Sequence, residues 1–311
     1  MGINWPSLLA TIEEATRIIE KKDISQPLKP YLRFNDPANR IIAMPAYIGG
    51  TFNMAGIKWI ASFPGNVSRS LKRAHSVVVL NDASTGVPVT LINSATLSGI
   101  RTAAVSGFVL GRYLTDNRRE GLTAGIIGLG PIGQLHLSML DACFGEMPDS
   151  ILLYDSNPDV RDAFDGSTIG TDLHMCSGWD EVYEGSDILI TCTVARERYI
   201  NKQPKRGGVY LNVSLRDFSV DLLEKIDLHI VDNWDEVCRE NTDIECAHLK
   251  FGLEKDDVLE IQDILTPNSL ANLADRSFMF NPMGMAVYDI AVAKYYQNLA
   301  ESLNCQVLLQ D

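Results

Sequence analysis

A glycine-rich segment between a strand pattern and a helix pattern constrains the fold of this chain more than any other feature. The apolar run 122–127 predicts a buried strand, Gly128-x-Gly130-x-x-Gly133 follows it, and a helical pattern extends over 132–143. In such a unit the first glycine permits a tight turn, the second lets a pyrophosphate approach the backbone, and the third lets helix and strand pack closely. A purely structural glycine turn is the alternative. The residues expected to hold a dinucleotide are Gly128, Gly130, Pro131, Ile132 and Gly133.

An acidic residue lies where a ribose-binding carboxylate is expected. The run 151–154 predicts the next strand, and Asp155 follows it, about 22 residues after the last glycine of the motif. A carboxylate accepts hydrogen bonds from both ribose hydroxyls and repels a 2′-phosphate, so Asp155 favours NAD over NADP. Arg161, the nearest cation, is expected on the following helix. A helix N-cap is the alternative role of Asp155 and is compatible with ribose binding.

Composition excludes several classes of protein. The 311 residues suffice for two domains, and 46% apolar with 22% charged residues is ordinary for a globular protein. A net charge of −13 argues against a nucleic-acid or anionic-membrane partner, and no run of about 18 apolar residues predicts a membrane span. The six cysteines and five histidines lack metal-ligand spacing, and the first residues lack a signal-peptide layout. We therefore expect a cytoplasmic protein without a metal site.

The chain before the glycine motif is rich in strand patterns. Strands are expected near 40–45, 56–60, 76–81 and 87–92, the last two joined by a hairpin at 82–86, with helices at 7–21 and 95–114. The charged run 115–121 is the best domain boundary.

After that boundary strands alternate with helices. Strand patterns at 172–177, 187–191, 208–213 and 228–231 extend a parallel sheet, and 232–273 is acidic and helical. A last helix from about 284 to 303 carries an apolar stripe that can pack on the first domain. The predicted fold class is therefore α/β, with a Rossmann-type dinucleotide domain (118–277) inserted into a discontinuous α+β domain (1–117 plus 278–311) for substrate binding and dimerisation.

Short segments along nearly the whole chain resemble the ornithine cyclodeaminase/μ-crystallin family. They are Met44–Ala46, Gly56–Lys58, Pro64–Asn66, Leu80–Asp82, Arg101–Val105, the glycine motif, Thr191–Thr193, Asn212–Ser214 with Asp217, and Met283–Gly284. The resemblance implies NAD, a small amino-acid-derived substrate and a homodimer built through a shared sheet. Two features depart from the family pattern: the leading strand is short or absent, which could weaken the dimer, and the glycine loop ends in Gly133.

The resemblance also assigns cationic residues to the substrate. Lys58 is implied to contact a substrate carboxylate and to polarise the developing iminium, and Arg101 to bridge substrate carboxylate and cofactor phosphate. An exposed strand lysine and a surface arginine are the alternatives. Lys29 and Arg33 lie in a proline-bounded loop and could hold further carboxylates. Lys29 aligns better with the family's basic loop residue, while a solvated loop is the alternative for both.

Asp217 is the second implied catalytic residue. It follows the strand 208–213 at the carboxyl edge of the predicted sheet, where ligands of open α/β sheets bind. The resemblance makes it the general base for the water that attacks an imine; an aspartate that caps the next helix is the alternative. Further residues are implied to contact the nicotinamide half of the cofactor or, for the last two, to close the site from the other domain: Thr193, Asn212, Val213, Ser214, Met283 and Gly284.

Within the family, segments such as Gln26–Arg33 and Asn281–Ala286 are most similar to members that oxidise an N-carboxyalkyl amino acid. This similarity implies NAD-dependent oxidative hydrolysis of N-(2-amino-2-carboxyethyl)-L-glutamate to L-2,3-diaminopropionate and 2-oxoglutarate, in siderophore or related secondary-metabolite biosynthesis. Ornithine cyclodeaminase, alanine dehydrogenase and ketimine reductase activities are alternatives, as is a non-catalytic, crystallin-like nucleotide-binding protein.

Overall fold

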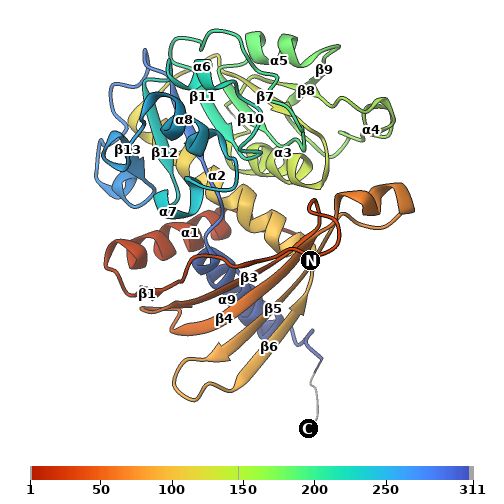
Figure 1. Cartoon of the computed structure of the whole chain (residues 1–311), viewed down its shortest axis with the longest axis vertical. Helices are drawn as coiled ribbons and strands as arrows, with labels where there is room; N and C mark the ends of the chain where they lie inside the picture. Colours follow the sequence, from red (N-terminus) through yellow and green to blue (C-terminus); the bar gives the residue numbers. More distant parts are fainter. Residues whose placement is uncertain (1, 146, 308–311) are drawn as a thin grey trace. The chain divides into compact units, whose positions relative to one another are not determined.

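The computed structural model describes residues 2–145 and 147–307 and divides the chain into two compact units (Figure 1). The antiparallel-sheet unit comprises Ala10–Arg101 and the residues from Met285 on, and the parallel-sheet unit comprises the residues up to Leu9 and Thr102–Gly284. Helices α1 (Trp5–Glu20) and α2 (Ala95–Asp116) each contribute residues to both units. The boundaries predicted from sequence, 117/118 and 277/278, stay a prediction.

The antiparallel-sheet unit is built on a six-stranded sheet of order β1-β3-β4-β5-β6, with β2 also paired to β3. The four strands predicted from sequence are confirmed within β3 to β6. The bounds are β1 Ile24–Ser25, β2 Tyr31–Leu32, β3 Arg40–Ile48, β4 Met54–Ser62, β5 Ala74–Asp82 and β6 Pro88–Asn93, with the 3-10 helix η1 at Pro64–Arg69.

Helix α9 (Ala286–Ser302) covers one face of this sheet and contacts β3, β4 and β5, as its apolar stripe predicts. A Cβ at Gly56 would lie 2.4 Å from the carbonyl oxygen of Val79 and 2.9 Å from Ile290 Cδ1, so this glycine lets both β5 and α9 approach β4 closely. Because side chains alternate along a strand, the neighbours of the residues that face α9 lie on the opposite face of the sheet, and some of them are apolar. Trp59 and Leu91 on that face are 38% and 58% exposed.

The parallel-sheet unit contains eight strands in the order β13-β12-β14-β11-β10-β7-β8-β9, and every neighbouring pair runs parallel. The predicted Rossmann-type class is confirmed. The strands are β7 Thr123–Ile127, β8 Ser150–Tyr154, β9 Asp172–Met175, β10 Ile188–Thr191, β11 Val209–Asn212, β12 Leu228–Val231, β13 Val258–Glu260 and β14 Phe278–Asn281.

Two of these strands, β13 and β14, were not predicted from the sequence. The prediction that 232–273 is helical is only partly right, since β13 lies within it. Strand β14 is inserted between β11 and β12, and all four of its residues are buried. A strand buried on both faces has no alternating pattern, and one of four residues is too short to stand out.

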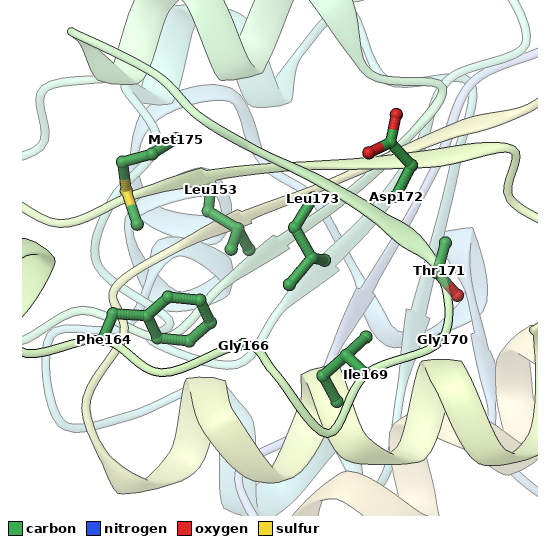
Figure 2. A pocket seen from close by; sticks show the side chains of 9 residues that line it. All are labelled: Leu153, Phe164, Gly166, Ile169, Gly170, Thr171, Asp172, Leu173 and Met175. Carbon is green, nitrogen blue, oxygen red and sulfur yellow. The ribbon is translucent and has the colours of Figure 1, made fainter.

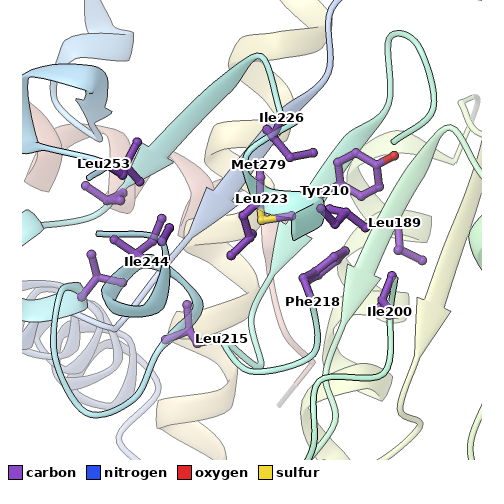
Figure 3. Packing of buried hydrophobic residues seen from close by; sticks show 14 of the residues in the cluster. Leu189, Ile200, Tyr210, Leu215, Phe218, Leu223, Ile226, Ile244, Leu253 and Met279 are labelled. Atoms are coloured by element: carbon purple, nitrogen blue, oxygen red, sulfur yellow. The ribbon is translucent and has the colours of Figure 1, made fainter. Parts of the chain in front are cut away.

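Helices cover both faces of the parallel sheet. Along β7, a Cβ at Gly125 would meet Val182 of α5, whereas the next residue, Ile126, lies near Gly133 of α3. The two faces of the strand are therefore both buried, which explains its unbroken apolar sequence. Figure 3 shows the core on one face, where Tyr210 and Phe218 pack edge-to-face. The helices of this unit are α3 Pro131–Phe144, α4 Pro158–Asp162, α5 Trp179–Gly185, α6 Val220–Leu223, α7 Trp234–Val237 and α8 Asp243–Phe251, with 3-10 helices η2 Lys255–Asp257 and η3 Asp263–Leu265.

Candidate functional site

The three glycines of the motif are required for three different reasons. Gly128 has φ of 98°, and a Cβ there would lie 2.7 Å from the carbonyl oxygen of Cys192. A Cβ at Gly133 would lie 1.9 Å from the carbonyl oxygen of Gly128, so this glycine lets α3 pack on the turn. A Cβ at Gly130, by contrast, would meet no heavy atom within 4 Å among the described residues beyond its chain neighbours. The space beside Gly130 fits the approach of a pyrophosphate.

The glycine loop also lies at the correct point of the sheet. Strand β7 pairs with β8 on one side and with β10 on the other, so the strand order reverses at β7. Ligands of open α/β sheets bind outside the carboxyl ends of the strands at this reversal. Helix α3 begins there with Gly130 at the N-cap, without a side-chain cap, and with Pro131 in its first turn. Its first N–H groups can therefore serve an anion.

Asp155 lies beside this loop. Its Oδ2 accepts a hydrogen bond from the backbone N–H of Leu129 at 2.8 Å, and its Oδ1 accepts one from Asn157 at 2.8 Å. The N-cap of α4 is Asn157, so the N-cap alternative for Asp155 is wrong. Arg161 lies on α4 as predicted, where its guanidinium group donates to the backbone carbonyl of Asp155 and covers the ring of Tyr154. The Asp155 carboxylate thus lies at the loop where a ribose is expected.

Asp217 is fully buried and lies among three hydroxyl groups. Thr193 Oγ1 donates to its Oδ1 at 2.6 Å, Ser214 Oγ donates to its Oδ2 at 2.6 Å, and Tyr199 Oη lies 3.4 Å from Oδ2. Burial raises the pKa of Asp217, while the donated hydrogen bonds oppose the shift. Burial and the adjacent Asp217 carboxylate also raise the pKa of Tyr199. Asp217 can therefore exchange protons through the hydroxyl groups that surround it.

The other residues predicted for the nicotinamide side are organised by internal hydrogen bonds. Asn212 uses its side chain within the unit: Nδ2 donates to Asn281 and Asp243, both at 2.9 Å, and Oδ1 accepts from the N–H of Leu215. The contact predicted between the cofactor and the backbone at Asn212 and Val213 stays a prediction.

Met283 and Gly284 are held by one buried carboxylate. Asp232 accepts the N–H of Met283 at 3.0 Å and that of Gly284 at 2.6 Å. Both residues group with the parallel-sheet unit, whereas the sequence pattern predicts them in the other domain. The expectation that they close the site from the other domain stays a prediction.

The antiparallel-sheet unit contains a buried cluster of two cations and one carboxylate. Lys58 Nζ lies 2.8 Å from Asp289 Oδ2, and Arg101 Nε lies 3.0 Å from Asp289 Oδ1. Lys58 also donates to Ser98 Oγ at 3.2 Å. All three charged side chains are almost fully excluded from solvent, so an exposed strand lysine and a surface arginine are wrong alternatives.

Burial lowers the pKa of Lys58 to about 7. Asp289 opposes this shift, and the nearby charges of Arg101 and Lys29 add to it. When Lys58 is protonated, Lys58, Arg101 and Asp289 together carry two positive charges and one negative charge. A bound carboxylate would balance this group and restore the proton affinity of Lys58.

Asp289 was not predicted from the sequence. The signal was present, because Asp289 interrupts the apolar run 285–293 on α9, and a carboxylate buried in such a run needs a cation.

The structure also distinguishes the two basic loop residues by their burial. Lys29 is buried and acts electrostatically on Lys58, whereas Arg33 is exposed and its guanidinium group lies over the ring of Tyr31.

A cavity of about 540 Å³ lies beside β8 and β9 (Figure 2). It is lined by Leu153, Leu173, Met175 and the loop 164–171, and by none of the residues predicted for the cofactor or the substrate. Within 2–145 and 147–307, three or more potential metal ligands do not cluster, and helices of these segments lack the length and apolarity to cross a bilayer.

Comparison with known proteins supplies relatives along almost the entire chain. The family model described as ornithine cyclodeaminase/mu-crystallin family matches residues 3–303. N-((2S)-2-amino-2-carboxyethyl)-L-glutamate dehydrogenase of Staphylococcus aureus is 32% identical over 94% of this chain and 90% of that protein. Alanine dehydrogenase of Archaeoglobus fulgidus is 26% identical over 97% and 92%. The solved Δ1-pyrroline-2-carboxylate reductase of Thermococcus litoralis, in complex with NADH and L-proline, shares the fold with a TM-score of 0.88 at 23% identity, over 99% of this chain and 96% of that one.

Proposed function

The chain belongs to the ornithine cyclodeaminase/mu-crystallin family, and we propose that it is an NAD-dependent dehydrogenase that oxidises a carbon–nitrogen bond of an amino acid. We further propose N-(2-amino-2-carboxyethyl)-L-glutamate as the substrate, with L-2,3-diaminopropionate and 2-oxoglutarate as products, in siderophore or related biosynthesis. The observation that carries this proposal is the buried Lys58–Asp289–Arg101 cluster, which holds two cations on one carboxylate. The named activity of the S. aureus relative supports the choice of substrate.

NAD is the proposed cofactor. The open space at Gly130 and the uncapped start of α3 suit a pyrophosphate, and the carboxylate of Asp155 suits a ribose. Arg101 and the backbone at Asn212 and Val213 are proposed to contact it as well, together with Ser214, Thr193 and Gly284. When bound, NAD accepts a hydride from the amine-bearing carbon.

Lys58 and Arg101 are proposed to bind a substrate carboxylate. Their shared partner Asp289 fixes both cations, so that the side chains are oriented before substrate arrives. Lys29 adds charge near Lys58 and suits a second carboxylate, and Arg33 and Met283 are proposed as outer contacts. A substrate with several carboxylates matches this concentration of cations in a chain of net charge −13.

Asp217 is proposed as the base that receives a proton from water. Hydride loss leaves an imine, water adds to its carbon, and the carbinolamine breaks its carbon–nitrogen bond to release an amine and a ketone. Since Asp217 is enclosed by hydroxyl groups, the proton passes through Thr193 or Ser214, each 2.6 Å from the carboxylate. General-base catalysis of this kind contributes about 10²–10⁴ in rate.

The functional form is proposed to be a homodimer. The face of the antiparallel sheet opposite α9 carries Trp59, Val89 and Leu91, which a lone subunit leaves partly exposed. Apolar side chains gathered on one exposed sheet face are typical of a protein–protein contact. A structural neighbour, an archaeal alanine dehydrogenase with bound NAD, is a dimer.

A substrate panel tests the proposed activity. Purified protein with NAD is assayed against N-(2-amino-2-carboxyethyl)-L-glutamate, L-ornithine, L-alanine and L-proline, with NADH followed by absorbance and products by mass spectrometry. The proposal predicts NADH only with the first compound.

Each remaining compound reports a different activity. Loss of ornithine without net NADH would indicate cyclodeamination. NADH formed with alanine would indicate an alanine dehydrogenase, and NADH formed with proline would indicate a ketimine reductase running in the oxidative direction. NADH binding without turnover of any compound would indicate a non-catalytic protein.

A further inference from the structure

Two loops of the parallel-sheet unit supply the groups that surround Asp217. The loop after β10 carries Thr193 and Tyr199, and the loop after β11 carries Ser214 and Asp217 itself. Hydrogen bonds of 2.6 Å require both loops to be placed within a few tenths of an ångström. A group that fixes the two loops against each other would therefore control the geometry at Asp217.

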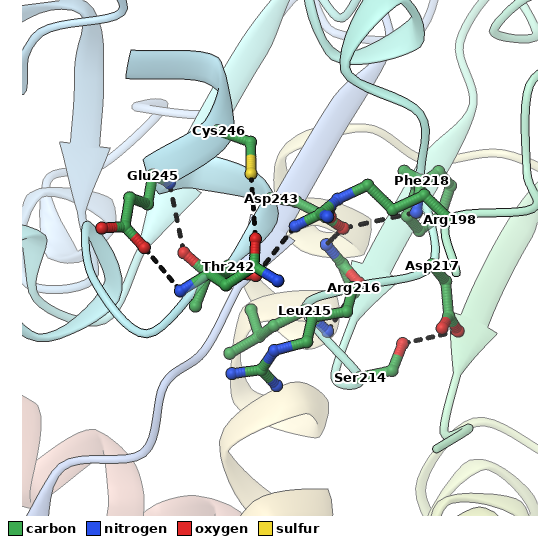
Figure 4. Close-up of polar contacts among 12 residues, drawn as sticks. Arg198, Ser214, Leu215, Arg216, Asp217, Phe218, Thr242, Asp243, Glu245 and Cys246 are labelled. Carbon is green, nitrogen blue, oxygen red and sulfur yellow. Dashed lines mark hydrogen bonds and ion pairs between the residues drawn. The ribbon is translucent and has the colours of Figure 1, made fainter. Parts of the chain in front are cut away.

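Asp243 contacts both loops (Figure 4). Its Oδ1 accepts a hydrogen bond from Arg198 Nε at 2.7 Å, which holds the first loop one residue before Tyr199. Its Oδ2 accepts from Asn212 Nδ2 at 2.9 Å and from the N–H of Phe218 at 3.4 Å. These two residues bracket the loop that carries Ser214 and Asp217.

The backbone of Asp243 holds the second loop at a further point. Its N–H donates to the carbonyl oxygen of Leu215 at 2.8 Å, and Asn212 Oδ1 accepts the N–H of Leu215 at 3.0 Å. Leu215 has φ of 63°, a left-handed conformation that is costly for a leucine and persists only where its surroundings impose it. Both backbone polar groups of the strained residue are thus fixed by Asp243 and its partner Asn212.

The position of Asp243 is itself well determined. It is the first residue of α8, whose N-cap Thr242 accepts the N–H of Glu245 at 3.2 Å. Arg198 is anchored a second time, because its Nη2 donates to the carbonyl oxygen of Asn241 at 2.8 Å. The Asp243 carboxylate is fully buried, so these bonds are shielded from competing water.

We propose that Asp243 is a positioning residue that holds the two loops so that the hydroxyl groups of Thr193, Tyr199 and Ser214 converge on Asp217. Asp243 acts through Arg198 on one loop and through Asn212 and Leu215 on the other. The proposal rests on the proposed catalytic role of Asp217. It assigns a function to α8, which contributes none of the residues predicted for the site.

The variants Asp243→Asn, Arg198→Gln and their combination test this proposal against a matched control, Asp187→Asn. Asp187 is likewise a carboxylate paired with cations, Lys205 and Arg119, but it is only partly buried and precedes β10 at the opposite, amino edge of the sheet. We expect Asp243→Asn to lower kcat by about 10²-fold, as misplacement of catalytic groups by about 1 Å does, with KM and the Kd for NADH nearly unchanged. Asp187→Asn should lower the melting temperature without lowering kcat.

Arg198→Gln should lower kcat in the same way, and the double variant should lose less than the product of the two single losses, because the two side chains share one contact. Additive effects, or equal losses of kcat in Asp243→Asn and Asp187→Asn, would overturn the proposal.

If Asp217→Asn loses turnover while Asp243→Asn does not, only the positioning role fails. If Asp217→Asn has no effect, the proposed role of Asp217 fails instead. A crystal structure of Asp243→Asn gives a readout without activity: intact Thr193–Asp217 and Ser214–Asp217 hydrogen bonds would overturn the proposal.

Discussion

Lys58 and Asp289 form a 2.8 Å ion pair in which both side chains are almost fully excluded from solvent. Asp289 pairs with Arg101 as well, so one carboxylate stabilises two buried cations. Such an arrangement is costly to bury, and Lys58 is the member whose proton is most easily lost.

The three charged residues should contribute unequally to stability. Asp289→Asn leaves two buried cations without their carboxylate and should lower the free energy of unfolding by about 3–5 kcal/mol. Lys58→Met keeps the Arg101–Asp289 pair and should not lower it at pH 6. Folding lowers the pKa of Lys58 from 10.5 to about 7, so its charge destabilises the fold fully below pH 7, and this effect is lost as the pH rises to 10.5. Urea unfolding of the two variants at pH 6 and at pH 10.5 measures their free energies of unfolding. A larger loss of this free energy in Lys58→Met than in Asp289→Asn would contradict the prediction.

Substrate capture should weaken above neutral pH. Lys58 is charged below its free-enzyme pKa of about 7 and neutral above it, and kcat/KM reports the ionisation of the free enzyme. The groups that face Lys58 are Asp289, Arg101, Lys29 and Ser98. We therefore expect kcat/KM to fall between pH 7 and 9, and Lys58→Arg to flatten this decline, since arginine keeps its charge. A profile equally steep in Lys58→Arg would assign the decline to another group.

Two glycines of one loop should respond oppositely to the same substitution. Gly130→Ala places a methyl group in open space with φ of −65°, so the melting temperature should stay nearly constant while NADH binds more weakly. Gly133→Ala forces a methyl group against the carbonyl oxygen of Gly128 and should lower the melting temperature. Calorimetry with and without NADH compares the two. Unchanged NADH affinity in Gly130→Ala would place the pyrophosphate elsewhere.

The exposed face of the antiparallel sheet should hold the dimer together. Leu91→Lys places a charge on that face and should yield monomers, as measured by light scattering on a sizing column. Val67→Lys is the matched control, since Val67 is 67% exposed on η1, outside the strands of the sheet, and should leave the dimer intact. A dimer that tolerates Leu91→Lys would show that copies associate through another surface.

Features encoded by neighbouring residues could be predicted from the sequence. The glycine motif, Asp155 and the apolar stripe of α9 each depend on fixed short spacings, and the structure places them as expected. Partnerships between distant residues could not be predicted. Asp289 is 188 positions from Arg101, and no local pattern pairs them. Similarly, the sequence did not pair Thr193 and Ser214 with Asp217, to which their hydroxyl groups donate, and Tyr199 beside them was missed.

The stoichiometry of the reaction tests the central claim most directly. Purified protein is given a limiting amount of N-(2-amino-2-carboxyethyl)-L-glutamate with excess NAD, and NADH, 2-oxoglutarate and L-2,3-diaminopropionate are quantified at completion. Our account predicts equal amounts of the three products from the wild type, and almost none at the same enzyme concentration from Asp217→Asn that still binds NADH. Wild-type protein that binds NADH but leaves this compound intact would contradict the account.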